Sequence, residues 1–298
     1  MDLSIFKDYT IQIVAIGSAI LGVISGIMGS FAFIRKQSLL GDAVSHSALP
    51  GICIAFILTQ IKATEALLLG ATLSGFLASY FIFSIVRYSK IKFDTALAVV
   101  FSSFFGLGVV FLTYIQKLAN SNQAGLDKFI FGQASTFLAR DLKMMVAMCI
   151  ITIVLVGLFW KEMKIVSFDS EFSDTIGISS QKVGMLISFL IVLAVMVGIQ
   201  MVGVVLMSAM LIAPASAARQ WTNQLSKMIV LSSIFGAISG VVGTVISSTT
   251  SKLATGPVIV LVASVIVLIS LIFAPKRGLL WRKLKFRNKN KEEYKVIE

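Results

Sequence analysis

The chain has few charged residues, one histidine and two cysteines among its 298 residues. Charged residues make up 13% of the chain and hydrophobic residues 57%, whereas an average soluble domain is about 25% charged. These values argue against a soluble fold. Cys53 and Cys149 lie in apolar runs without a partner at metal-ligand spacing, so we interpret them as small buried hydrophobic side chains.

Three motifs of enzymes are also missing from the sequence. A single histidine excludes the His-Glu-x-x-His pair of metalloproteases, and there is no Gly-x-Ser-x-Gly segment for a serine nucleophile. No Gly-x-x-x-x-Gly-Lys-[Ser/Thr] segment is present to hold the phosphates of ATP. We therefore expect that the protein is not an enzyme, and that any ATP it depends on is hydrolysed by another chain.

Long apolar runs dominate what is present. A bilayer crossing needs about 20 apolar residues, and the spacing of the runs predicts an all-α polytopic membrane protein with eight or nine transmembrane helices. The number of helices is eight or nine because the second run is short and because only Gln200 divides residues 183–218. The first run follows an acidic start, so we interpret it as a retained span and not as a signal peptide. The runs cover residues 11–34, 47–61, 66–86, 95–115, 142–160, 183–199, 201–218, 228–248 and 257–274.

Lysine and arginine predict the orientation, because short basic loops stay on the cytoplasmic side. With nine crossings, 19 of the 26 basic residues fall on one side, which places the C-terminus in the cytoplasm. We divide the chain into a transmembrane domain, residues 1–275, and a basic cytoplasmic tail, residues 276–298, that can lie against membrane lipid. The net charge of +12 then reports topology, and we expect no nucleic-acid partner.

Glycines recur at close spacing in two of the runs. Such faces let helix backbones approach closely, and we interpret them as ordinary packing surfaces between transmembrane helices. The glycines are Gly22, Gly26 and Gly29 in the first run and Gly236, Gly240 and Gly243 in the eighth.

The segment from Arg35 to Gly51 contains the only histidine. Asp42 and His46 are four residues apart, so in a helix they share one face, with Ser45 beside Asp42. A carboxylate and an imidazole so placed can hold one cation, and this oxygen and nitrogen ligand set suits manganese, iron or zinc. The same residues could equally be a capping acid and an interfacial histidine, and the spacing alone does not separate the two.

Pro50 adds a second feature to this segment. A proline has no N–H for the carbonyl four residues back, which here belongs to His46. Irregular backbone at membrane depth is tolerated where it is buried in protein or lines a wet cavity. We therefore expect a break in the helix at Pro50, bordering a pathway.

The stretch Gly41-Asp-Ala-Val-Ser-His-Ser-Ala-Leu-Pro-Gly51 resembles a signature of the membrane subunits of the ABC-3 family, the zinc, manganese and iron permeases of ATP-binding-cassette importers. Residues 202–218 resemble the family's proline-broken span, with its break at Pro214. Residues 168–178 resemble its cytoplasmic coupling segment, and residues 255–260 resemble the start of its last span. The Leu-Pro-Gly after His46 is more similar to the manganese branch than to the zinc branch.

The resemblance implies an importer-like fold of the ABC type II class and a homodimeric or pseudo-dimeric permease. It implies two cytoplasmic ATPase subunits and an extracytoplasmic lipoprotein or periplasmic protein that delivers the ion. By the resemblance, Asp42 and His46 contact the metal inside the pathway, whereas the simple topology puts them at its cytoplasmic edge. A re-entrant or broken second helix would reconcile the two. The divalent ion is the transported substrate, and no permanently bound cofactor is expected.

The cytoplasmic connection at residues 161–182 has the pattern of a short amphipathic helix. Asp169 or Ser170 can cap it, and Gly177 can adopt the left-handed conformation that ends it. A helix on the bilayer surface would carry basic residues on its polar face, but this face is acidic, so a protein partner fits better. By the resemblance this is the helix that docks on the ATPase. The residues we assign to coupling are Phe168, Glu171, Phe172, Ile176 and Gly177.

A secondary transporter driven by an ion gradient is the alternative to an ATP-driven importer. Such proteins carry acidic residues inside the membrane for ion coupling. Apart from Asp42, no acidic residue lies well inside an expected span, and Asp94 opens the fourth span, where a capping role explains it.

Overall fold

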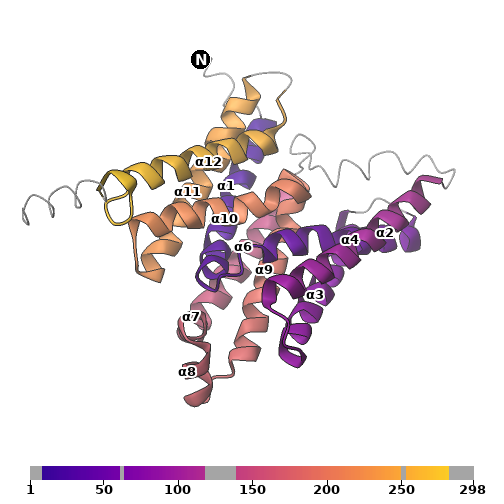
Figure 1. Cartoon of the computed structure of the whole chain (residues 1–298). Helices are drawn as coiled ribbons and strands as arrows, with labels where there is room; N and C mark the ends of the chain where they lie inside the picture. Colours follow the sequence, from indigo (N-terminus) through magenta and orange to yellow (C-terminus); the bar gives the residue numbers. More distant parts are fainter. Residues whose placement is uncertain (1–8, 61–63, 118–138, 250–252, 282–298) are drawn as a thin grey trace, which may run out of the picture.

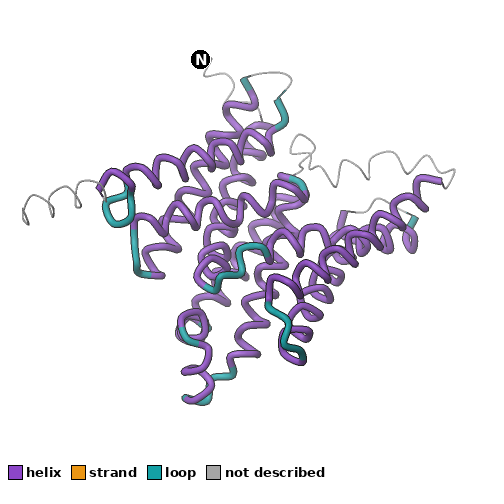
Figure 2. The backbone as a smooth tube through the Cα atoms, viewed as in Figure 1, coloured by secondary structure: helices purple, strands orange, loops and turns teal. Residues whose placement is uncertain are grey.

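The computed structural model describes residues 9–60, 64–117, 139–249 and 253–281, and these segments are helices joined by short turns (Figure 2). No strand occurs within these four ranges. The helices are α1 (Tyr9–Ile34), α2 (Leu40–Thr59), α3 (Thr64–Tyr88), α4 (Phe93–Lys117), α6 (Ala139–Leu158), α7 (Trp160–Phe168), α8 (Ser170–Thr175), α9 (Ser180–Val202), α10 (Val204–Trp221), α11 (Leu225–Ser248) and α12 (Thr255–Phe273).

The helices form two groups around a common centre (Figure 1). Helices α2, α3 and α4 pack together on one side, and α10, α11 and α12 pack together on the other. Helix α9 contacts members of both groups, and α1 runs beside α9, α10 and α11. Of the spanning helices, α1, α2 and α9 are the most buried, whereas α4 and α6 expose most of their length. The large exposed hydrophobic surface is what lipid or another membrane protein must cover.

Eight described helices are long and apolar enough to cross a membrane, by length and composition. Helix α10 is not among them. The predicted all-α polytopic architecture is thus confirmed. Two boundaries differ from the sequence prediction. Helix α2 begins seven residues before the apolar run at residue 47, and Gln200 lies inside α9, while the interruption before α10 falls at Gly203 with φ +90°.

The glycine faces of the first and eighth runs pack against each other, as α1 and α11. A Cβ added at Gly22 would overlap the backbone of Gly236, and one at Gly240 would overlap the backbone of Ser18. The close approach allows hydrogen bonds between the helices, such as that between the hydroxyls of Ser30 and Ser232 at 2.8 Å. This contact joins the centre of the molecule to the α10–α12 group.

The interpretation of the basic tail falls largely outside the described residues, since residues 282–298 are not described.

Candidate metal site

Asp42 and His46 both lie on the first half of α2. A turn after α1 brings the chain back, with Lys36 at φ +57°, and α2 begins at Leu40 without a side-chain cap. Asp42 therefore lies in the first turn of the helix and not at the capping position. The positive end of the helix dipole favours a carboxylate there.

The two side chains converge as their four-residue spacing predicts. His46 Nε2 lies 3.6 Å from Asp42 Oδ1, which is too long for a hydrogen bond. A cation bound at about 2.1 Å from each atom would hold them roughly 3.4 Å apart in tetrahedral geometry. The observed separation is therefore close to that of two ligands of one ion.

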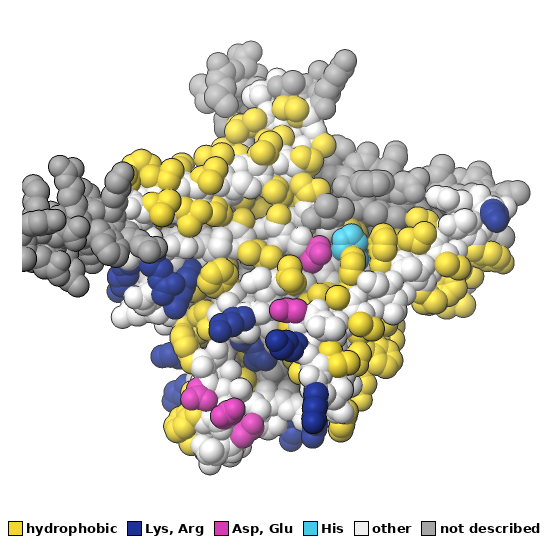
Figure 3. Space-filling view, viewed as in Figure 1, with side chains coloured by type: hydrophobic (Ala, Val, Ile, Leu, Met, Phe, Trp, Pro, Cys, Tyr) yellow, Lys and Arg dark blue, Asp and Glu magenta, His cyan; other side chains and the backbone are white. Residues whose placement is uncertain are grey.

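The pair opens onto the surface of the chain. The side chain of Asp42 is 42% exposed and that of His46 is 19% exposed. Figure 3 shows the histidine beside an acidic side chain, with hydrophobic side chains next to the pair. Among the described residues, no three His, Cys, Asp or Glu side chains come together to hold a metal. Within the described part of one chain, Asp42 and His46 are thus a pair of candidate ligands, without a third side chain of these four types beside them.

Ser45, which we expected beside Asp42, hydrogen-bonds within its own helix. Its side chain is fully buried, and its hydroxyl donates to the carbonyl oxygen of Gly41 at 2.7 Å. The hydroxyl of Ser45 therefore has a hydrogen-bond partner in the helix backbone.

Neither proline interrupts its helix. Helix α2 continues through Pro50 and α10 continues through Pro214, so the breaks that we expected at these residues are absent. Each proline still lacks the N–H that a carbonyl four residues back would accept, which leaves the His46 carbonyl without its usual helical donor. The interruption that precedes α10 is at Gly203, where glycine permits the positive φ.

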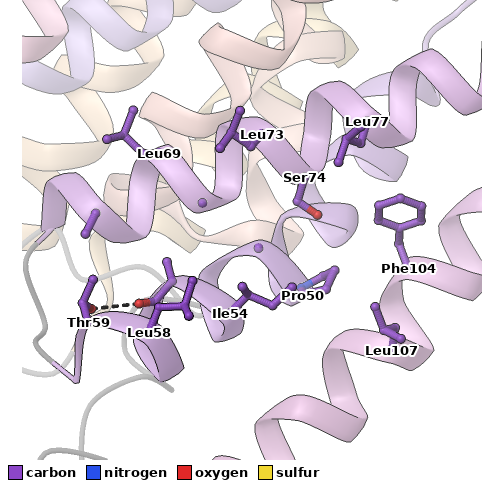
Figure 4. Close-up of a pocket in the computed structure, with 14 residues that line it drawn as sticks. Pro50, Ile54, Leu58, Thr59, Leu69, Leu73, Ser74, Leu77, Phe104 and Leu107 are labelled. Atoms are coloured by element: carbon purple, nitrogen blue, oxygen red, sulfur yellow. Dashed lines mark hydrogen bonds between the residues drawn. The ribbon is translucent and has the colours of Figure 1, made fainter.

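Pro50 also lines an apolar groove between α2, α3 and α4, with a volume of about 510 Å³ (Figure 4). In that view Leu69, Leu73 and Leu77 of α3 lie across from Pro50 and Ile54 of α2. No charged residue lines the groove. Its chemistry suits lipid or apolar side chains and not an ion. The groove and the Asp42–His46 pair are therefore separate features of α2.

The segment expected to couple to an ATPase forms two helices. Phe168 ends α7, and α8 is capped by Asp169, whose carboxylate accepts from the N–H of Phe172 at 2.9 Å. Gly177 has φ +84°, as predicted for the residue that ends this helix. Phe168, Phe172 and Ile176 are about half exposed, and Glu171 is exposed as well. These apolar side chains are thus partly exposed, but they lie on two helices, because extended backbone at Asp169 separates the end of α7 from α8.

A polar cavity of about 550 Å³ adjoins α8 and reaches Arg35 and Arg87. Burial lowers the pKa of Arg35 to about 10, so its guanidinium stays charged at neutral pH. Two hydrogen bonds from Ser180, first from its backbone N–H and then from its hydroxyl, lower the pKa of Asp174. The residues that line this cavity show that the ends of α1 and α3 lie beside α8.

The sequence of the chain matches a known protein family over nearly its whole length. Residues 7–274 match the ABC 3 transport family. The chain belongs to this family. It is 50% identical over 278 residues to the zinc transport system membrane protein TroC of Treponema pallidum, covering 93% of each chain. It is 46% identical over 268 residues to the manganese transport system membrane protein MntC of Bacillus subtilis, covering 90% of this chain and 62% of that protein.

A solved structure is similar to this chain in its fold as well as in its sequence. PsaBC of Streptococcus pneumoniae, in complex with a Fab, matches with a TM-score of 0.81 and 33% identity, covering 95% of this chain and 97% of that one. The fold of this family member is therefore that of the permeases of ABC metal importers, and the protein is a multi-pass membrane protein.

Proposed function

We propose that this chain is the permease subunit of an ATP-driven importer that carries manganese across the bacterial plasma membrane. Membership of the ABC 3 family supports the general function of a metal-importer permease. The observation that supports an ion site is the convergence of Asp42 and His46 at 3.6 Å on an exposed face. The ion is the substrate, held by these side chains while it passes.

A second copy of the chain completes the site. One chain offers one carboxylate and one imidazole, and both are partly exposed, as they would be if they faced a partner across a two-fold axis. Two copies supply two carboxylates and two imidazoles to one ion. This set reaches the four ligands of a tetrahedral site, and bidentate carboxylates or water would raise the number.

The nature of the ligands favours a divalent transition metal. Imidazole and carboxylate suit manganese, iron and zinc, whereas copper(I) prefers sulfur and calcium prefers an all-oxygen site. The names of two relatives divide between zinc and manganese. We assign manganese because the Leu-Pro-Gly after His46 is similar to the manganese branch, and zinc or iron uptake are the other outcomes of the test.

Transport requires a separate ATPase that docks on α8. The exposed side chains of Phe168, Phe172 and Ile176 are apolar anchors of the kind that dominate protein contacts, and acidic residues surround them. The docking surface and the C-terminus are cytoplasmic in this scheme, and an extracytoplasmic protein delivers the ion to the opposite end.

Metal uptake by variants tests this function. Asp42→Ala and His46→Ala are expected to abolish uptake of radioactive manganese at normal membrane levels, because each removes half of the protein ligands. Asp94→Ala is the matched control, since Asp94 is an exposed carboxylate in the first turn of α4. Full uptake by either site variant would contradict the proposal, and competition by zinc and iron identifies the preferred ion.

The same assay separates an importer driven by ATP from a secondary transporter. Uptake by the permease should stop when the ATPase is deleted or carries a substitution that blocks ATP hydrolysis. Uptake that persists without ATP hydrolysis but stops when the proton gradient is collapsed would favour the secondary transporter.

A further inference from the structure

The imidazole of His46 lies against two phenylalanine rings of the neighbouring helix α4. Its ring centroid is 5.1 Å from that of Phe101 and 5.2 Å from that of Phe105, with interplanar angles of 78° and 90°. These are edge-to-face contacts, the arrangement that aromatic rings prefer. The two phenylalanines are one helical turn apart and stack on each other with an interplanar angle of 12°.

No hydrogen bond orients the imidazole within the described residues. A histidine that binds a metal normally donates its other ring N–H to a carboxylate, a carbonyl or water, which fixes the ring. Among the described contacts of His46 are Asp42 at 3.6 Å and the two phenylalanine rings. The terminal torsion of a histidine is broad and roughly two-fold, so a ring without a constraint is free to turn Nε2 away from Asp42.

We propose that Phe101 and Phe105 are positioning residues that hold the imidazole of His46 with Nε2 facing Asp42. This inference rests on the proposed role of Asp42 and His46 in binding the ion. The two phenylalanine rings stand perpendicular to the imidazole and restrict its rotation. Because Phe101 and Phe105 stack on each other, each also restricts the rotation of the other. The rings therefore take the place of the hydrogen bond that usually orders a metal-binding histidine, and they keep the two ligands arranged for a divalent cation before it arrives.

Helix α4 supplies a matched control for this role. Phe104 lies between the two positioning residues in sequence, but it lines the apolar groove and contacts Phe81, with ring centroids 6.2 Å apart. Phe104→Leu removes the same ring from the same helix as Phe101→Leu or Phe105→Leu. A purely space-filling role for the rings predicts similar effects from all three substitutions.

The test is manganese uptake by the complete transporter, with KM and the maximal rate measured separately. Loss of a group that orients a metal ligand typically weakens metal binding about 10–100-fold, so the Phe101→Leu, Phe105→Leu double variant should raise KM at least about tenfold. The maximal rate at saturating manganese should stay within about twofold. Phe105→Tyr retains a ring, so its KM should stay near the normal value. Phe104→Leu should leave KM unchanged.

The outcomes separate this inference from the proposed function. An unchanged KM in the double variant, or an equal rise in Phe104→Leu, overturns the positioning role while Asp42→Ala still abolishes uptake. Normal uptake by Asp42→Ala instead overturns the metal site itself. If the double variant does not reach the membrane, the single variant Phe105→Leu decides the question, because Phe105 is 38% exposed and packs less tightly.

Discussion

The packing of α1 on α11 makes a quantitative prediction at Gly26. A Cβ added there would lie 2.6 Å from the backbone carbonyl carbon and oxygen of Ser232, and neither atom can move without moving α11. Ordinary carbon contacts are about 3.5–4.0 Å, so Gly26→Ala forces the helices apart by roughly 1 Å. That shift also lengthens the hydrogen bond from the Ser232 hydroxyl to the Gly26 carbonyl, now 2.8 Å.

Gly26→Ala changes the free energy of unfolding in two opposite directions, and the destabilising contributions are the larger ones. Overpacking costs about 1–3 kcal/mol and a weakened buried hydrogen bond about 1 kcal/mol. Alanine in place of glycine inside a helix returns about 1 kcal/mol. Gly26→Ala should therefore destabilise the protein by about 1–3 kcal/mol, which lowers the melting temperature by roughly 5 °C at about 2–4 °C per kcal/mol.

Thermal unfolding of the purified protein in detergent measures this effect against a matched control. Gly157 lies in α6, and a Cβ added there meets nothing within 4 Å. Gly157→Ala should leave the melting temperature unchanged or raise it slightly. Equal melting temperatures for the Gly26→Ala and Gly157→Ala proteins would refute the close backbone contact between α1 and α11.

Two further predictions concern transport. Pro50→Ala gives the His46 carbonyl its helical N–H donor, so it should stabilise α2 and lower uptake, and unchanged uptake would show that the free carbonyl has no role. Phe172→Ala and Gly177→Val should lower ATPase binding and metal-stimulated ATP hydrolysis in a reconstituted complex while manganese binding stays normal. A branched residue resists the φ of +84° at Gly177. Normal ATPase binding and hydrolysis in both variants would show that the ATPase docks on another surface.

The apolar runs predicted most helix ends to within a few residues, because lipid exposure selects long hydrophobic segments. The start of α2 was missed because apolar runs do not reveal a helix that packs against protein and not against lipid. Its first turns contain Gly41, Asp42 and Ser45, whose polarity hides a helix that is mostly buried in protein. The break near the end of α9 was also misplaced, since a left-handed Gly203 has no hydropathy signal and Gln200 is compatible with a helix.

The candidate site was predictable in part. The spacing of Asp42 and His46 is local, so a helical period brings them together. The contacts of His46 with Phe101 and Phe105 join residues more than fifty positions apart, and in the sequence these rings resemble ordinary lipid-facing residues. The buried position of Ser45 was equally hidden, because its sequence neighbours do not show which face of α2 meets the core.

The central claim is that two copies of the chain hold one ion between paired Asp42 and His46 side chains. Equilibrium binding of manganese to the purified permease in lipid tests it most directly. The predicted stoichiometry is one ion for every two chains, lost in Asp42→Ala and His46→Ala and retained in Asp94→Ala. One ion bound for each chain, or unchanged binding by His46→Ala, would contradict it.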